Sequence, residues 1–66
     1  MTSEEVKKRV ADIAACKDDP EAAHSMEDDL YFDLLAQIAS GLCVDAKGCA
    51  DEATKSKEIN FPRWCA

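Results

Sequence analysis

The stretch from Asp19 to Leu42 constrains the fold most, because it predicts one long helix with more apolar surface than one neighbour can cover. Asp19 is suited to cap the first free amides, and Pro20 to occupy the first helical position, where a missing N–H costs nothing. Gly41 is suited to end the helix, since glycine adopts the left-handed conformation without strain. The segment from Ser25 to Asp28 also resembles a capping box, so a break there is the alternative to a continuous helix over residues 20–41.

Most faces of this helix are apolar when its side chains are placed at 100° per residue. The apolar arc contains Leu30, Tyr31, Phe32, Leu34, Leu35, Ala36, Ile38, Ala39 and Leu42. Only a narrow strip is polar, with Asp29, Asp33, Gln37 and Ser40. We therefore expect the long helix to be central and to pack against neighbours on two or more sides.

Three other segments can supply those neighbours. Residues 3–17 predict a first helix with an apolar stripe, and residues 46–57 predict a weaker third helix that Asp45 can cap. The stripe of the third helix consists of Ala and Cys, which bury little area. Residues 58–66 form a tail with three large apolar side chains, Ile59, Phe61 and Trp64.

Length and composition favour an all-α class. Sixty-six residues make one domain, 47% of them are hydrophobic, and only two are Gly and two Pro. We predict a single domain, 1–66: a small three-helix bundle with a long central helix and an aromatic tail packed back on it.

Two contacts follow from that prediction. In the core, Leu30, Leu34 and Ile38 should be buried against apolar residues of the first helix, namely Val6, Val10 and Ile13. In the tail, Phe61 and Trp64 should pack beside Phe32, Leu35 and Ala39 of the long helix, leaving Arg63 exposed or turned toward its acids.

The charge of the chain is acidic and uneven. The net charge is −6, and between Asp18 and Asp33 there are seven acids and no Lys or Arg. Such a surface argues against direct nucleic-acid binding and allows a basic partner. No signal peptide or membrane span is recognisable, so we expect a cytoplasmic protein with no membrane association.

A polar cluster interrupts the apolar arc. Glu27 falls near its centre, and His24 and Asp28 lie three residues before it and one after it. These three side chains are weak candidates for a metal site, although helical metal sites collect ligands from several helices and the other helices offer no matching acids. In the structural alternative, His24 and Glu27 satisfy each other, or Glu27 pairs with Arg9 or Arg63.

The cysteines show no recognised metal or redox spacing. No C-x-x-C pair occurs among the four cysteines, Cys16, Cys43, Cys49 and Cys65. A zinc site is one alternative, but its ligands, Cys43, Cys49, Cys65 and His24, would have a spacing unlike that of known structural zinc motifs. Two disulfides are the other alternative. In a reducing compartment we expect free thiols and no cofactor.

Two sequence segments carry a family resemblance. The pairing of AAHSMEDDLYFDLLAQIASG with a terminal INFPRWCA resembles small proteins of actinobacteria and their phages whose function is uncharacterised. The resemblance covers about two-thirds of the chain. It implies a bacterial or phage cytoplasm and transfers no activity, site or cofactor.

These observations favour a non-enzymatic protein-interaction module whose partner is an unknown protein. The first alternative is an acidic inhibitor that mimics nucleic acid in a basic cleft, and the second is a metal-dependent enzyme using His24 and Glu27. Candidate interaction residues are Asp29, Asp33, Phe61, Arg63 and Trp64.

Overall fold

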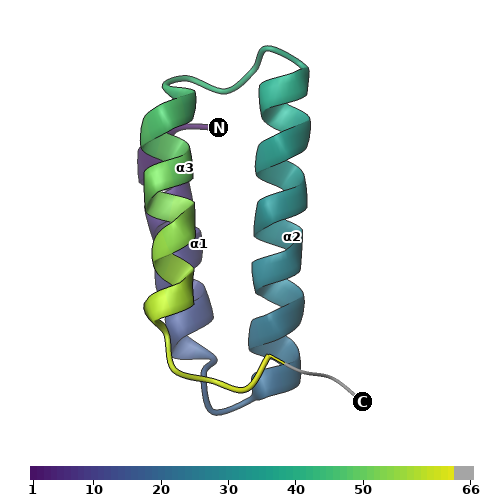
Figure 1. Ribbon diagram of the computed structural model, residues 1–66, viewed down its shortest axis with the longest axis vertical. Coiled ribbons are helices and arrows are strands. Elements are labelled where there is room, and N and C mark those ends of the chain that lie inside the picture. Colours follow the sequence, from purple (N-terminus) through teal and green to yellow (C-terminus); the bar gives the residue numbers. More distant parts are fainter. Residues whose placement is uncertain (64–66) are drawn as a thin grey trace.

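Three helices pack side by side in the computed structural model, which describes residues 1–63. They are α1 (Ser3–Ala15), α2 (Pro20–Ala39) and α3 (Ala46–Thr54), and α3 continues into a short 3-10 helix, η1 (Lys55–Glu58). The described part of the chain has no strand, so the predicted all-helical bundle is confirmed at this level. Helices α1 and α3 run in the same direction, and α2 runs opposite to both (Figure 1).

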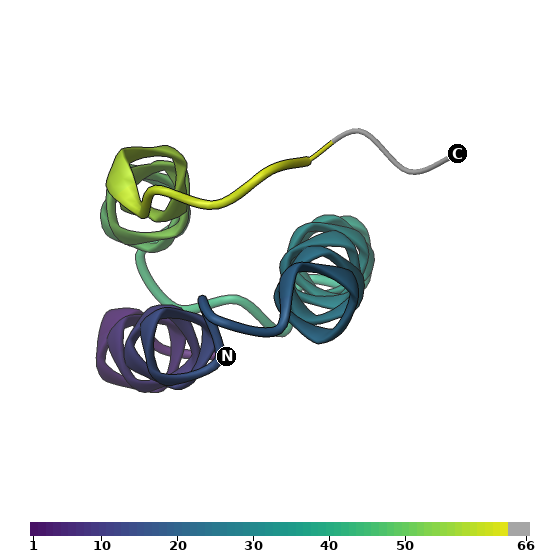
Figure 2. The ribbon, with the colours of Figure 1, turned by 90° about the horizontal axis from the view of Figure 1, so that it is seen from below.

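Seen along the helices, the three elements occupy the corners of a triangle (Figure 2). The segment after η1 passes from α3 toward α2 on the side away from α1. Within residues 1–63, the segment after η1 therefore crosses the α2–α3 side at the end of the bundle where η1 lies.

Helix α2 is continuous through His24 and Ser25, so the alternative break is absent. The Asp19 carboxylate accepts a hydrogen bond from the Ala22 amide at 3.3 Å, which begins the helix as expected. The helix ends at Ala39, where Gly41 adopts a φ of 73° and its amide donates to Ile38 O at 3.1 Å. The Leu42 amide donates to Gln37 O at 2.9 Å, which completes a Schellman motif.

The other two helices begin with side-chain caps. Thr2 and Glu5 form a reciprocal capping box at the start of α1. Asp45 caps α3 by accepting from the Gly48 amide at 3.1 Å. A Cβ atom at position 48 would collide with the Asp45 carboxylate, so any other residue here would displace the capping side chain, whereas glycine leaves it in place although it weakens the helix.

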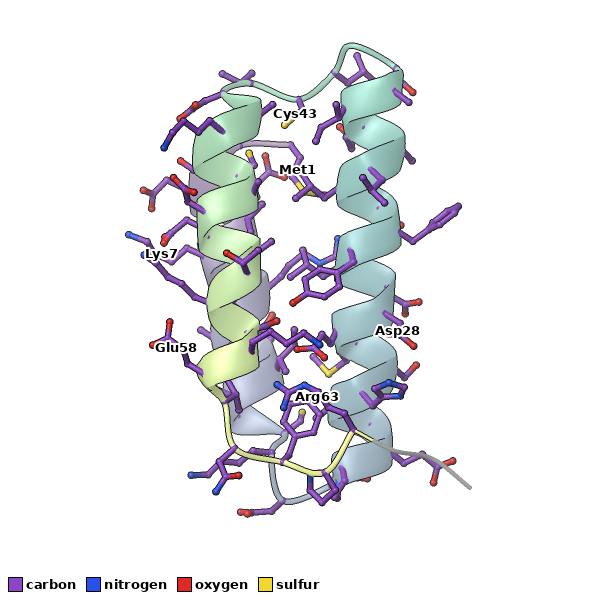
Figure 3. The ribbon with its side chains drawn as sticks, viewed as in Figure 1. Met1, Lys7, Asp28, Cys43, Glu58 and Arg63 are labelled. Atoms are coloured by element: carbon purple, nitrogen blue, oxygen red, sulfur yellow. The ribbon has the colours of Figure 1, made fainter. Side chains whose placement is uncertain are left out.

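The N-terminal residue closes the end of the bundle opposite the tail. The Met1 ammonium donates to Gln37 Oε1 at 2.9 Å and to Leu42 O at 3.0 Å. The Val44 amide in turn donates to Met1 O at 3.0 Å. Met1 and Cys43 accordingly lie near each other at this end of the bundle (Figure 3).

The core joins all three helices and the tail. Its buried apolar residues are Val6, Ile13, Ala23, Leu30, Leu34, Cys49, Ala53 and Phe61. Val10 is half-buried against this core, as part of the predicted contact with α1. The expected burial of Ile38 is wrong, because its side chain is 39% exposed. Ile38 lies on the side of α2 toward α3, and α3 presents Ala and Cys side chains too short to cover it.

No helix in the described residues is long and apolar enough to cross a membrane.

Two leucines of α2, Leu30 and Leu35, test which face of the helix is the core face. Leu30 is fully buried whereas Leu35 is 66% exposed. We expect Leu30→Ala to lower the free energy of unfolding by about 2–5 kcal/mol, and Leu35→Ala to change it by only about 0.5 kcal/mol. Urea denaturation measures both. Equal losses for the two variants would contradict the placement of α2.

Candidate functional site

A buried carboxylate lies inside the bundle, near the end that carries the tail. Glu27 is only 1% exposed, and it projects from α2 toward the tail and η1. Its Oε1 accepts from Arg63 Nε at 2.9 Å, and its Oε2 accepts from Arg63 Nη2 at 3.2 Å. Ser56 Oγ donates to Oε2 at 2.6 Å. Both oxygens are therefore satisfied, as a buried charge requires.

The guanidinium of Arg63 also orders the tail. Its Nη2 donates to Ser56 O at 2.7 Å and to Ile59 O at 3.1 Å, and its Nη1 donates to Phe61 O at 3.3 Å. Its central carbon lies 4.0 Å from the centre of the Phe61 ring. Because the planar fork of arginine makes these contacts together, lysine could not replace it. One side chain thus joins α2, η1 and the tail (Figure 3).

Tyr31 and Lys57 extend this network toward the middle of the bundle. The Tyr31 hydroxyl lies within hydrogen-bonding distance of Ser56 Oγ. Since Ser56 donates its proton to the carboxylate, Tyr31 must donate to Ser56. Lys57 Nζ lies 3.8 Å from Glu27 Oε1 and 5.9 Å from the centre of the Tyr31 ring.

The surroundings of Glu27 determine its charge. Burial raises the pKa of this carboxyl, but the hydrogen bonds from Arg63 and Ser56 and the charges of Arg63 and Lys57 outweigh burial. The pKa of Glu27 is therefore lowered from its ordinary value. A carboxylate with a lowered pKa and two hydrogen-bonded oxygens is a weak general base, so this arrangement favours a structural role for Glu27 over a role in proton transfer.

The candidate metal ligands are separated. Glu27 is directed toward Arg63, whereas His24 Nε2 lies 3.8 Å from Asp28 Oδ2. Within residues 1–63, no group of three or more His, Cys, Asp or Glu side chains is placed to hold a metal ion. Of the two arginines proposed as partners for Glu27, the structure selects Arg63, and Arg9 pairs instead with Asp33 at 3.0 Å.

The predicted interaction residues divide into two groups. Phe61 is buried in the core and Arg63 is bound to Glu27, so both side chains serve the fold in this structure. Asp29 is exposed, and Asp33 is half-exposed in its ion pair with Arg9. Trp64 lies outside the described residues, so its predicted packing stays a prediction.

Three of the cysteines can be placed. Cys16, Cys43 and Cys49 are free, and Cys65 lies outside the described residues. Cys49 is buried, and its Sγ lies 3.4 Å from Val44 O. Burial, with the nearby Cys43 thiol, raises the pKa of Cys49. This thiol therefore belongs to the packing between α3 and the loop before it.

An apolar surface on α2 is the second feature of note. Phe32 is 71% and Leu35 is 66% exposed, and Ala36 and Ala39 are exposed beside them. These four residues recur at i, i+3, i+4 and i+7, so they share one side of the helix, which we call the α2 apolar face. Phe61 was expected to pack beside this face; it instead enters the core, and Phe32 and Leu35 are left exposed.

A groove adjoins the α2 apolar face. It has a volume of about 280 Å³ and lies between α2 and α3, lined by Tyr31, Leu34, Leu35, Ala50, Ala53 and Thr54. Leu35 belongs to both the groove and the face, so the two form one apolar surface. The groove exists because α3 offers only Ala50, Ala53 and Thr54 opposite the larger side chains of α2.

Three members of the network around Glu27, namely Ser56, Tyr31 and Lys57, were not identified from the sequence. Ser56 continues the stripe of Cys49 and Ala53 on the third helix, which is the signal that could have placed it beside α2. The roles of Tyr31 and Lys57 have no comparable signal, because both depend on the angle between α2 and η1.

Comparison of the chain with protein-family models, with curated proteins and with solved structures found no match.

The pH dependence of stability tests the buried carboxylate. A folded-state pKa below the ordinary value means that Glu27 stabilises the fold above about pH 4.3, and that this stabilisation is lost as pH falls through the folded-state value. At pH 7 we expect Glu27→Gln to lower the free energy of unfolding by about 3 kcal/mol.

The loss should shrink below pH 4, as measured by thermal or urea unfolding across pH. Asp28→Asn, which alters an exposed neighbouring carboxylate, is the control and should have little effect at any pH. A Glu27→Gln effect of the same size at pH 7 and pH 3 would contradict the ionised, paired state.

Proposed function

We propose that this protein is a non-enzymatic interaction module that binds another protein through the α2 apolar face and the adjoining groove. One observation carries the proposal: Phe32 and Leu35 are largely exposed on a helix whose opposite side is the core. Large apolar side chains gathered on one surface are typical of sites that bind another protein. A bacterial or phage cytoplasm, as the family resemblance implies, is the setting we propose for this interaction.

Helix-in-groove recognition is the mode that fits this surface best. In that mode, apolar side chains of a partner helix insert between two helices of the receptor. The groove, with a volume of about 280 Å³, has room for one or two such side chains, and the α2 apolar face extends it over about two helical turns. Specific affinity would come from one or two large anchors rather than from the whole area.

Mimicry of nucleic acid is the second candidate, and the distribution of acids supports it in part. Glu21, Asp28 and Asp29 are exposed on α2, where no Lys or Arg occurs. Other acids are paired within the chain, among them Asp12, Asp33, Asp51 and Glu52. Because pairing reduces the field available to a basic cleft, the apolar surface is the better basis for the proposal.

The two candidates make different predictions for a capture experiment. Tagged protein is used to capture partners from a bacterial lysate, alongside Leu35→Ser in the face and Ala11→Ser on the exposed side of α1 as the matched control. We expect Leu35→Ser to lose the captured protein, Ala11→Ser to retain it, and part of the binding to survive about 0.5 M salt.

Mimicry predicts the opposite pattern. Binding that disappears in moderate salt and is unaffected by Leu35→Ser would contradict the apolar proposal and favour an acidic mimic.

A further inference from the structure

The exposed side of α2 changes character along its length. Asp28 and Asp29 precede Phe32 by four and three residues, so they lie one turn before it on the same side of the helix. Glu21 lies seven residues before Asp28 and continues the same strip. The strip is therefore acidic over the N-terminal half of α2 and apolar over its C-terminal half, where the α2 apolar face lies.

The acids of this strip are not neutralised by basic residues of α2. No Lys or Arg occurs between residues 18 and 46. Arg9 is engaged with Asp33, and Arg63 and Lys57 with Glu27. On the α3 side, Lys47 pairs with Asp51 at 2.9 Å. Asp28 has His24 beside it at 3.8 Å, an interaction that is ionic only when the imidazole is protonated.

A second copy of the chain is a poor occupant for this surface. Pairing two α2 helices in parallel would place Asp28 beside its own counterpart. Pairing them antiparallel over the apolar half would overlap residues 32–39, whose only charged side chain is Asp33, so the overlap would bring no Lys or Arg to an acid of the other copy. Each copy also carries a net charge of −6, so like-charge repulsion opposes self-association in both arrangements.

A partner helix that carries basic side chains avoids both the contact of acid with acid and the repulsion between two negatively charged chains. We infer that the partner is an amphipathic helix that lays apolar side chains on the α2 apolar face and in the α2–α3 groove, and carries Lys or Arg over Glu21, Asp28 and Asp29. This inference rests on the proposed function and adds the chemistry of the partner. The apolar contact supplies most of the affinity, and the charges supply orientation, selectivity and a faster association rate.

Designed peptides test the charge of the partner directly. The probe is a labelled helical peptide of about 18 residues with Leu on one side and Lys on the other, long enough to cover the face and the acids before it. The matched peptide replaces each Lys by Glu and keeps the Leu side. Binding to the full chain is measured by fluorescence anisotropy at low and high salt. We expect the Lys peptide to bind at least about tenfold more tightly at low salt, with the difference narrowing at about 0.5 M salt.

Protein variants locate the contact. Asp28→Asn combined with Asp29→Asn should weaken the Lys peptide several-fold, and Leu35→Ser should weaken both peptides. The control removes the same charge elsewhere, by Glu4→Gln combined with Glu58→Gln, two exposed residues on α1 and η1. This control should bind the Lys peptide as the original chain does.

The outcomes separate this inference from the proposed function. If both peptides bind equally and Leu35→Ser weakens both, the apolar docking surface stands and the basic partner is overturned. If the Lys peptide does not bind, the inference is also overturned. A dimer in sedimentation that Leu35→Ser converts to a monomer would then identify a second copy as the occupant. Failure of the docking surface itself is shown separately, by partner capture that Leu35→Ser leaves unchanged.

Discussion

The structure depends on how the carboxylate of Glu27 is neutralised inside the bundle. A charge taken out of water is costly unless it is paired and hydrogen-bonded, and α2 brings this one to within 1% of complete burial. Arg63 and Ser56 meet the requirement from a segment about thirty residues later in the chain. The same guanidinium binds Ser56, Ile59 and Phe61 through their carbonyls, so neutralising Glu27 also fixes the path of the tail and brings Phe61 into the core.

In the part of the chain that the structure describes, this arrangement covers one end of the α2–α3 side. Further along α2 toward its C-terminus, the small side chains of α3 leave a groove next to Leu35. The α2 apolar face adjoins this groove and continues to Ala39. The polar network thus orders the end of the molecule near the tail, and the apolar surface that we propose as the docking site lies in the half of α2 further from that end. Asp28 and Asp29 are exposed between these two regions, where the basic side chains of the proposed partner helix would meet them.

Local signals in the sequence were sufficient for the helices and insufficient for their side-chain partners. Asp19, Gly41 and Asp45 act through contacts within a few residues, so their roles could be predicted from spacing alone. Glu27 was recognisable as an anomaly on an apolar arc, and Arg63 as one of two possible partners. The choice between Arg9 and Arg63 depends on how the helices are rotated, which no local pattern encodes. The exposure of Ile38 was missed for a related reason, because it depends on how little of α2 the short side chains of α3 can cover. Phe32 lies on the side of α2 opposite the core, and it is exposed because Phe61, which was expected beside it, enters the core instead.

A double-mutant cycle on Glu27 and Arg63 tests the central claim most directly. The free energy of unfolding is measured for the original chain, Glu27→Gln, Arg63→Met and the double variant at pH 7. The account predicts a coupling energy of about 1.5–3 kcal/mol, because each single change leaves its partner buried without its counter-charge. Effects that add to within about 0.5 kcal/mol would show that the two side chains act independently, and would contradict the account.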